Sequence, residues 1–140
     1  NVIPGEVTIG IDIRSISAEA KADAAKHIEA FAQETAAARQ TPLTIDHLGN
    51  GTPAPISKEM VSFLSRLCQN DNIPYMTLPS GAGHDAMHWT DYTQVGMLFI
   101  PCKNGISHNP LESAKIKDIT RVARLLQKAV LEVSQEGFHF

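Results

Sequence analysis

Two loops of the sequence each carry a histidine beside small and polar residues that suit catalysis or metal binding. The first loop, residues 80–85, reads Ser-Gly-Ala-Gly-His-Asp and contains His84. The second, residues 103–110, reads Lys-Asn-Gly-Ile-Ser-His-Asn-Pro and contains His108. Histidine is the commonest general acid or base near neutral pH and the commonest metal ligand. Each histidine taken alone is interpreted equally well as a hydrogen-bonded loop residue. The prediction of a catalytic or metal-binding site therefore depends on whether the two loops meet.

A second candidate group is the pair Asp12 and Arg14. Both residues alternate with isoleucines, so they would share the open face of a strand. An arginine can bind a substrate carboxylate through two parallel hydrogen bonds. The alternative interpretation is an exposed ion pair on a strand, and the two residues by themselves favour it.

The first histidine loop also has an alternative interpretation as a nucleotide site. Residues 81–86 fit the dinucleotide fingerprint with Ala in its last position. That fingerprint needs an acidic residue about 20 positions further on to hold a ribose. Cys102 and Lys103 stand there instead, which disfavours a dinucleotide site.

A nucleophilic mechanism is the other alternative, with Ser80 or Cys102 attacking and His84 or His108 as base. Ser80 is not flanked by glycines on both sides, as the serine of an α/β-hydrolase elbow would be. Cys102 directly follows Pro101 at the end of an apolar segment and is better interpreted as a packing residue.

The hydrophobic pattern predicts an α/β fold that would position these loops. Alternating or continuous apolar residues predict strands, and apolar residues at helical spacing predict helices. We expect strands at 7–13, 43–48, 75–78 and 95–100, and helices at 17–39, 57–70, 84–92 and 114–135. In such sheets ligands bind beyond the carboxyl ends of the strands, so the two histidine loops should converge.

The helix over residues 114–135 is expected to bury one apolar stripe. Its members recur at spacings of three and four and are Ile116, Ile119, Ala123, Leu126, Val130 and Val133. The Gly- and Pro-rich stretch that begins at Gly49 separates a β-α-β unit, residues 1–48, from a second part, residues 49–140.

Composition excludes several classes of protein. The 140 residues are 43% apolar and 19% charged with a net charge of −3, which is typical of a globular protein and excludes a strongly basic nucleic-acid-binding surface. No apolar run is long enough to span a membrane. Two cysteines are too few for a disulfide scaffold, and with no visible signal peptide they favour a reducing, cytoplasmic compartment. The chain begins without methionine and runs almost at once into strand-like sequence, so we expect its start to be a cut edge.

Five motifs occur in a recognisable order. They are Asn-Val-Ile-Pro-Gly-Glu-Val at 1–7, Asp-Ile-Arg at 12–14, Pro-Ser-Gly-Ala-Gly-His-Asp-Ala at 79–86, Met-Leu-Phe-Ile-Pro at 97–101 and Gly-Ile-Ser-His-Asn-Pro at 105–110. This arrangement resembles the C-terminal portion of the N-carbamoyl-L-amino-acid hydrolase and allantoate amidohydrolase family, whose members are built like dinuclear-metal aminopeptidases.

The resemblance implies a fold and an assembly. Residues 1–48 would be the second half of an inserted α/β lid domain, through which a homodimer forms. Residues 49–140 would be the C-terminal segment of a zinc-aminopeptidase-like α/β catalytic domain.

The resemblance also implies roles for individual residues. His108 would be a metal ligand in a site for two divalent ions, Mn²⁺ or Zn²⁺. His84, with the backbone of Gly83, would contact the substrate and polarise the carbonyl group that is attacked. Asn1 and Arg14 would hold the carboxylate of a small-molecule substrate.

The activity implied is hydrolysis of the carbamoyl or ureido C–N bond of N-carbamoyl-L-amino acids or allantoate. The family's His-x-Asp and Glu-Glu motifs do not occur in this sequence, so the chain alone is expected to be inactive and to hold no metal. Alternatives are a related metallo-dipeptidase or deacylase and a non-catalytic dimerisation fragment.

Overall fold

The computed structural model describes residues 1–136 of the chain, which divide into two compact units. The first unit contains Asn1–Pro55 together with the short loop Pro79–Ala82. The second contains Ile56–Leu78 and the chain from Gly83 onward.

The first unit contains one long helix, α1 (Ala18–Arg39). Ser17 caps its start, because its side chain accepts a hydrogen bond of 3.1 Å from the backbone N–H of Ala20. The helix ends at Gln40, whose left-handed conformation lets its N–H reach carbonyl groups of the last turn. The predicted helix over residues 17–39 is therefore confirmed.

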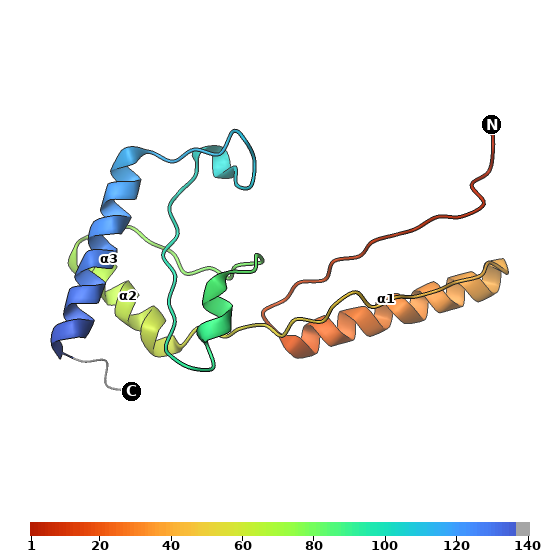
Figure 1. Ribbon diagram of the computed structural model, residues 1–140, viewed down its shortest axis with the longest axis horizontal. Helices are drawn as coiled ribbons and strands as arrows, with labels where there is room; N and C mark the ends of the chain where they lie inside the picture. Colours follow the sequence, from red (N-terminus) through yellow and green to blue (C-terminus); the bar gives the residue numbers. More distant parts are fainter. Residues whose placement is uncertain (137–140) are drawn as a thin grey trace. The chain divides into compact units, whose positions relative to one another are not determined.

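The chain that follows α1 runs back along the helix (Figure 1). The imidazole Nε2 of His47 lies 3.6 Å from Oε1 of Glu29, and Nζ of Lys21 donates to the carbonyl of Gly51 at 2.5 Å. These are surface contacts, and no residue of α1 is buried.

The second unit is centred on α2 (Lys58–Asn70) and α3 (Ile116–Glu136), which pack against each other (Figure 1). Its core is small and consists of Leu67, Cys68, Leu125 and Ala129, with Phe63, Leu64, Ile73 and Leu98 around it. Ser57 caps α2 by accepting from the N–H of Met60 at 3.0 Å. The predicted helices over 57–70 and 114–135 are confirmed, with α3 beginning two residues later than expected.

The apolar stripe predicted for the last helix is wrong in its choice of face. Leu125 and Ala129 are buried against α2, whereas Leu126 and Val130 are more than half exposed. The reason is that α2 packs beside the stripe rather than on it, and adjacent positions of a helix point about 100° apart. The stripe thus remains largely open in the part of the chain that the structure describes.

The four expected strands are not formed within residues 1–136. The segments 7–13, 43–48, 75–78 and 95–100 carry no strand pairing, and the one β-bridge in this range joins Cys102 to Ala114. A strand needs a neighbouring backbone to pair its N–H and C=O groups, and these segments find none. The alternating apolar side chains of the first segment are accordingly exposed, as at Val7 and Ile9.

Two short 3₁₀ helices complete the second unit. The first, η1 (Asp85–Trp89), stands within the range 84–92, for which the sequence predicts a short helix. The second, η2 (Lys103–Gly105), lies in the other histidine loop. None of the helices in the described range is both long enough and apolar enough to cross a membrane.

Candidate functional site

Arg14, one of the predicted site residues, makes three side-chain hydrogen bonds in the first unit. Its Nε and Nη2 atoms donate to Oδ2 of Asp12 at 2.9 and 2.6 Å, and its Nη1 atom donates to the carbonyl of Gly81 at 2.9 Å. Both partners belong to the first unit, so the guanidinium ties the Gly-rich loop to the first segment of the chain. A guanidinium has five N–H groups, and these bonds use three of them. One N–H on each terminal nitrogen remains available for a further acceptor.

The charges of Asp12 and Arg14 stabilise each other. The hydrogen bond from Arg14 lowers the pKa of the Asp12 carboxyl below its usual value, and the same hydrogen bond raises the pKa of Arg14. Both side chains are well exposed, so solvent screens the pair. The expected ion pair is confirmed and is exposed, but the segment that carries it is not a strand. The pair leaves the arginine fully charged.

Asn1 is the second residue expected to hold a carboxylate, and it lies with Arg14 in the N-terminal segment that precedes α1. Its side chain is exposed. Within residues 1–136 the hydrogen-bond partners of the Arg14 side chain are Asp12 and Gly81, and Asn1 is not among them.

His84 lies at the start of η1 in the second unit. Its carbonyl accepts from the N–H of Met87 at 2.9 Å, which begins the helical turn. Its ring packs edge-on against Phe99, with centroids 5.6 Å apart and planes inclined at 65°. At Gly83 a Cβ atom would meet Sδ of Met87 at 3.8 Å, an ordinary contact. This contact of the His84 ring with Phe99, 15 residues later in the chain, is one that sequence patterning does not reveal.

His108 lies in the second histidine loop with a left-handed backbone, φ 55°. Its N–H donates to Oε2 of Glu112 at 2.7 Å. Glu112 is a residue that sequence reasoning missed, although its spacing of four from His108 across an Asn-Pro turn is a usable signal. The nearby thiol of Cys102 lies 3.7 Å from the carbonyl of Ile100 and 3.8 Å from Oε1 of Glu112. Neither of these contacts pairs the thiol with a histidine that could act as its base.

The other cysteine, Cys68, is a core residue. Cys68 is 5% exposed, and burial, with a smaller contribution from Asp71, raises the pKa of its thiol. It is therefore held as a neutral thiol rather than as a thiolate nucleophile.

A complete metal site needs several donor side chains in one place. Nowhere in residues 1–136 do three His, Cys, Asp or Glu side chains gather closely enough to hold a metal ion. His84 and His108 both belong to the second unit, but they are not part of such a cluster. The described residues thus do not fit a complete metal site, because catalytic sites draw about three protein ligands per ion.

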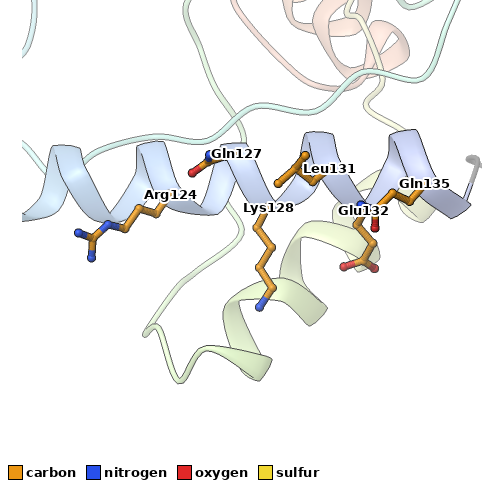
Figure 2. A pocket seen from close by; sticks show the side chains of 6 residues that line it. All are labelled: Arg124, Gln127, Lys128, Leu131, Glu132 and Gln135. Carbon is orange, nitrogen blue, oxygen red and sulfur yellow. The ribbon is translucent and has the colours of Figure 1, made fainter.

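A hollow lies on the surface of α3, and none of the predicted site residues lines it (Figure 2). It has a volume of about 440 Å³ and is lined by Arg124, Gln127, Lys128, Leu131, Glu132 and Gln135. Two of these side chains are engaged with α2 and the residue after it, since Glu132 pairs with Arg66 at 2.5 Å and Lys128 pairs with Asp71. The hollow is therefore a shallow region beside an interhelical contact.

Comparison with known proteins shows which sequences the chain is similar to. The family model for Peptidase family M20/M25/M40 matches residues 4–132. Allantoate amidohydrolase of Escherichia coli (strain K12) is 35% identical over 126 residues, which is 90% of this chain and 31% of the relative. N-carbamoyl-L-amino-acid amidohydrolase of Pseudomonas sp. (strain NS671) is 33% identical over 132 residues, which is 94% of this chain and 32% of the relative.

A third relative, N-carbamoyl-L-amino acid amidohydrolase of Geobacillus stearothermophilus, is 31% identical over 135 residues, or 96% of this chain and 33% of the relative. The chain thus spans about a third of the length of the curated relatives it matches.

Proposed function

The chain belongs to Peptidase family M20/M25/M40, and from this membership we propose that it is part of a metal-dependent amidohydrolase. The reaction proposed is hydrolysis of the carbamoyl or ureido C–N bond of N-carbamoyl-L-amino acids or allantoate. The family indicates an α/β fold, to which the described residues contribute helices and unpaired extended segments.

One observation carries this proposal: relatives with two named activities match nine-tenths or more of this chain. N-carbamoyl amino acids and allantoate both place a carboxylate next to a carbamoylated nitrogen. Arg14 suits such a substrate, because its two uncommitted N–H groups can donate to both oxygens of a carboxylate.

The remaining site residues receive the roles that the family resemblance implies. His84, whose ring packs edge-on against Phe99, polarises the carbonyl group of the substrate, with the backbone of Gly83 beside it. Asn1 assists Arg14 at the substrate carboxylate. His108 serves as a metal ligand.

Two divalent ions, Mn²⁺ or Zn²⁺, are part of the proposal. The described residues do not form a complete site for these ions. The proposal places most of the metal ligands outside the described residues, since each ion needs about three.

The proposal extends to organisation and location. Residues 1–48 form half of a lid domain through which a homodimer assembles, and residues 49–140 form the C-terminal segment of the catalytic domain. Two free cysteines, Cys68 and Cys102, suit a reducing compartment, and we place the enzyme in the cytoplasm.

The test compares the 140-residue chain with a chain extended to the full length of its relatives. We expect the extended chain to bind Mn²⁺ or Zn²⁺ stoichiometrically and to release ammonia from N-carbamoyl-L-amino acids or allantoate. The shorter chain should do neither. An extended chain that binds metal but cleaves dipeptides or N-acyl amino acids would replace the proposal with a dipeptidase or deacylase. An extended chain that forms dimers, binds no metal and cleaves nothing would favour a non-catalytic dimerisation role.

A further inference from the structure

The loop that carries His108 is closed at its base. Cys102 and Ala114 form an antiparallel bridge, and the N–H of Lys103 donates to the carbonyl of Ser113 at 2.7 Å. The loop thus begins and ends at one place in the second unit. Its conformation is set by what lies between these two ends.

A tight turn follows His108 and reverses the chain. The N–H of Glu112 donates to the carbonyl of Asn109 at 2.9 Å, and the side-chain Oδ1 of Asn109 accepts from the N–H of Leu111 at 2.9 Å. Pro110 occupies the second position of this turn, where its fixed φ is favourable. The turn brings Glu112 back toward His108, four residues earlier in the chain.

The carboxylate of Glu112 then spans the loop. Its Oε2 atom accepts from the backbone N–H of His108 at 2.7 Å, and its Oε1 atom lies 3.8 Å from Sγ of Cys102 at the base. A hydrogen bond to an ionised acceptor is shorter and stronger than a neutral one, and 2.7 Å is in that range. The tip of the loop is thereby connected to its base through one side chain.

His108 needs such a connection because of its backbone. Its φ of 55° lies in the left-handed region, which residues with a Cβ occupy only when their surroundings hold them there. The direction of the Cα–Cβ bond follows from the backbone conformation. Whatever holds the N–H of His108 therefore also sets where its imidazole leaves the loop.

We propose that Glu112 is a positioning residue for His108: its carboxylate holds the histidine in the left-handed conformation and so fixes the direction of the imidazole. This inference deepens the proposed function and rests on it, because the proposed function is what gives His108 a role as a metal ligand. The hydrogen bond and the backbone conformation can nevertheless be measured without any activity.

The test uses Glu112→Ala and Glu112→Gln in the 140-residue chain, with Glu59→Gln as a matched control on an exposed acidic residue of α2. NMR reports the intraresidue amide-to-Hα NOE of His108, which is strong at positive φ, and the shift and exchange rate of its amide proton. In Glu112→Ala we expect the NOE to weaken, the amide proton to move upfield and exchange to accelerate roughly ten-fold. Glu112→Gln should keep the NOE, because an amide oxygen still accepts the hydrogen bond. The amide proton of His108 should then lie less far downfield than in the unmodified chain. The control should leave His108 unchanged.

Two outcomes would overturn the proposal. If Glu112→Ala keeps the NOE and the amide shift, the Asn109 turn alone holds the loop. If the amide shifts spread through α2 and α3 instead of staying within residues 102–114, Glu112 supports the fold in general. Failure of the proposed function is distinguished separately: an unmodified full-length chain without hydrolase activity would refute that function, whereas the His108 NOE decides on Glu112 either way.

Discussion

The guanidinium of Arg14 donates a 2.9 Å hydrogen bond to the main-chain carbonyl of Gly81, 67 residues later in the sequence. Two further bonds join the same guanidinium to Asp12. Arg14 is thus anchored on both sides while keeping one N–H on each terminal nitrogen. An anchored arginine loses less conformational entropy when it binds a carboxylate, which suits the role proposed for it.

Replacing Arg14 by alanine should raise the KM for an N-carbamoyl amino acid at least ten-fold in the full-length enzyme. The loss of a carboxylate contact of about 1.4 kcal/mol corresponds to that factor. Arg14→Lys should lie in between, because a lysine cannot make the paired contact. Steady-state kinetics measures the effect, and Arg39→Ala, in the last turn of α1, is the control. A KM unchanged by Arg14→Ala would remove this residue from the site.

The pair of Asp12 and Arg14 predicts a specific pH dependence. Because Arg14 lowers the pKa of Asp12, the pair contributes stability at pH values above the usual carboxyl pKa and loses it as the pH falls through the lowered one. NMR titration of the Asp12 carboxyl carbon should show protonation below the usual range. In Arg14→Ala the midpoint should return upward, whereas Arg39→Ala should not move it. Equal midpoints in the first variant and the unmodified chain would contradict the pairing.

Leu67 has 0% exposure and lies at the centre of the α2–α3 contact. Leu67→Ala should lower the free energy of unfolding by about 2–5 kcal/mol, because it removes apolar contacts and leaves a cavity. Urea unfolding followed by the fluorescence of Trp89, in the same unit, measures the change. Leu48→Ala is the control, since Leu48 is 98% exposed and its truncation should cost less than about 0.5 kcal/mol. Similar losses in both variants would argue against the described core.

Gly96 lies directly against α2, so even a methyl group would collide there. A Cβ at this position would be 2.6 Å from Cγ of Met60 and 2.9 Å from Cδ1 of Leu64. Gly96→Ala should cost about 1–3 kcal/mol of stability through overpacking.

The same urea experiment tests this cost against two references. Gly51→Ala should be nearly neutral, because nothing lies within 4 Å of its Cβ position. In a Met60→Ala background the penalty of Gly96→Ala should shrink, as coupling between contacting residues requires. A neutral Gly96→Ala would show that the segment 95–100 does not approach α2 this closely.

Sequence reasoning succeeds where the signal is local. Ser17 and Ser57 are recognisable as helix caps, and the helices begin there, because a cap depends on residues within one turn. It fails for the strands, since an alternating segment such as 7–13 becomes a strand only beside a pairing partner that its own residues do not specify. The buried face of α3 is misjudged for a similar reason: the position of α2 decides between Leu125 and Leu126.

The contacts of the candidate site also separate into local ones, which the sequence predicts, and non-local ones, which it does not. The ion pair of Asp12 and Arg14 is foreseeable, because two residues at a spacing of two share a face. The contact of Arg14 with Gly81 is not, since 67 residues separate them. The contact of Glu112 with His108 could in principle be predicted from the sequence, because an Asn-Pro turn returns the chain to His108.

Helix α1 should unfold differently from α2 and α3 when the protein is heated. Its 22 residues bury no side chain, so it depends on alanine propensity and its caps, whereas α2 and α3 share a core. Helices supported only by propensity unwind gradually from their ends, while packed ones melt together. Circular dichroism should therefore record a broad, sloping loss of helicity from α1 beneath a sharper transition from the α2–α3 pair, two thermal signatures in one chain.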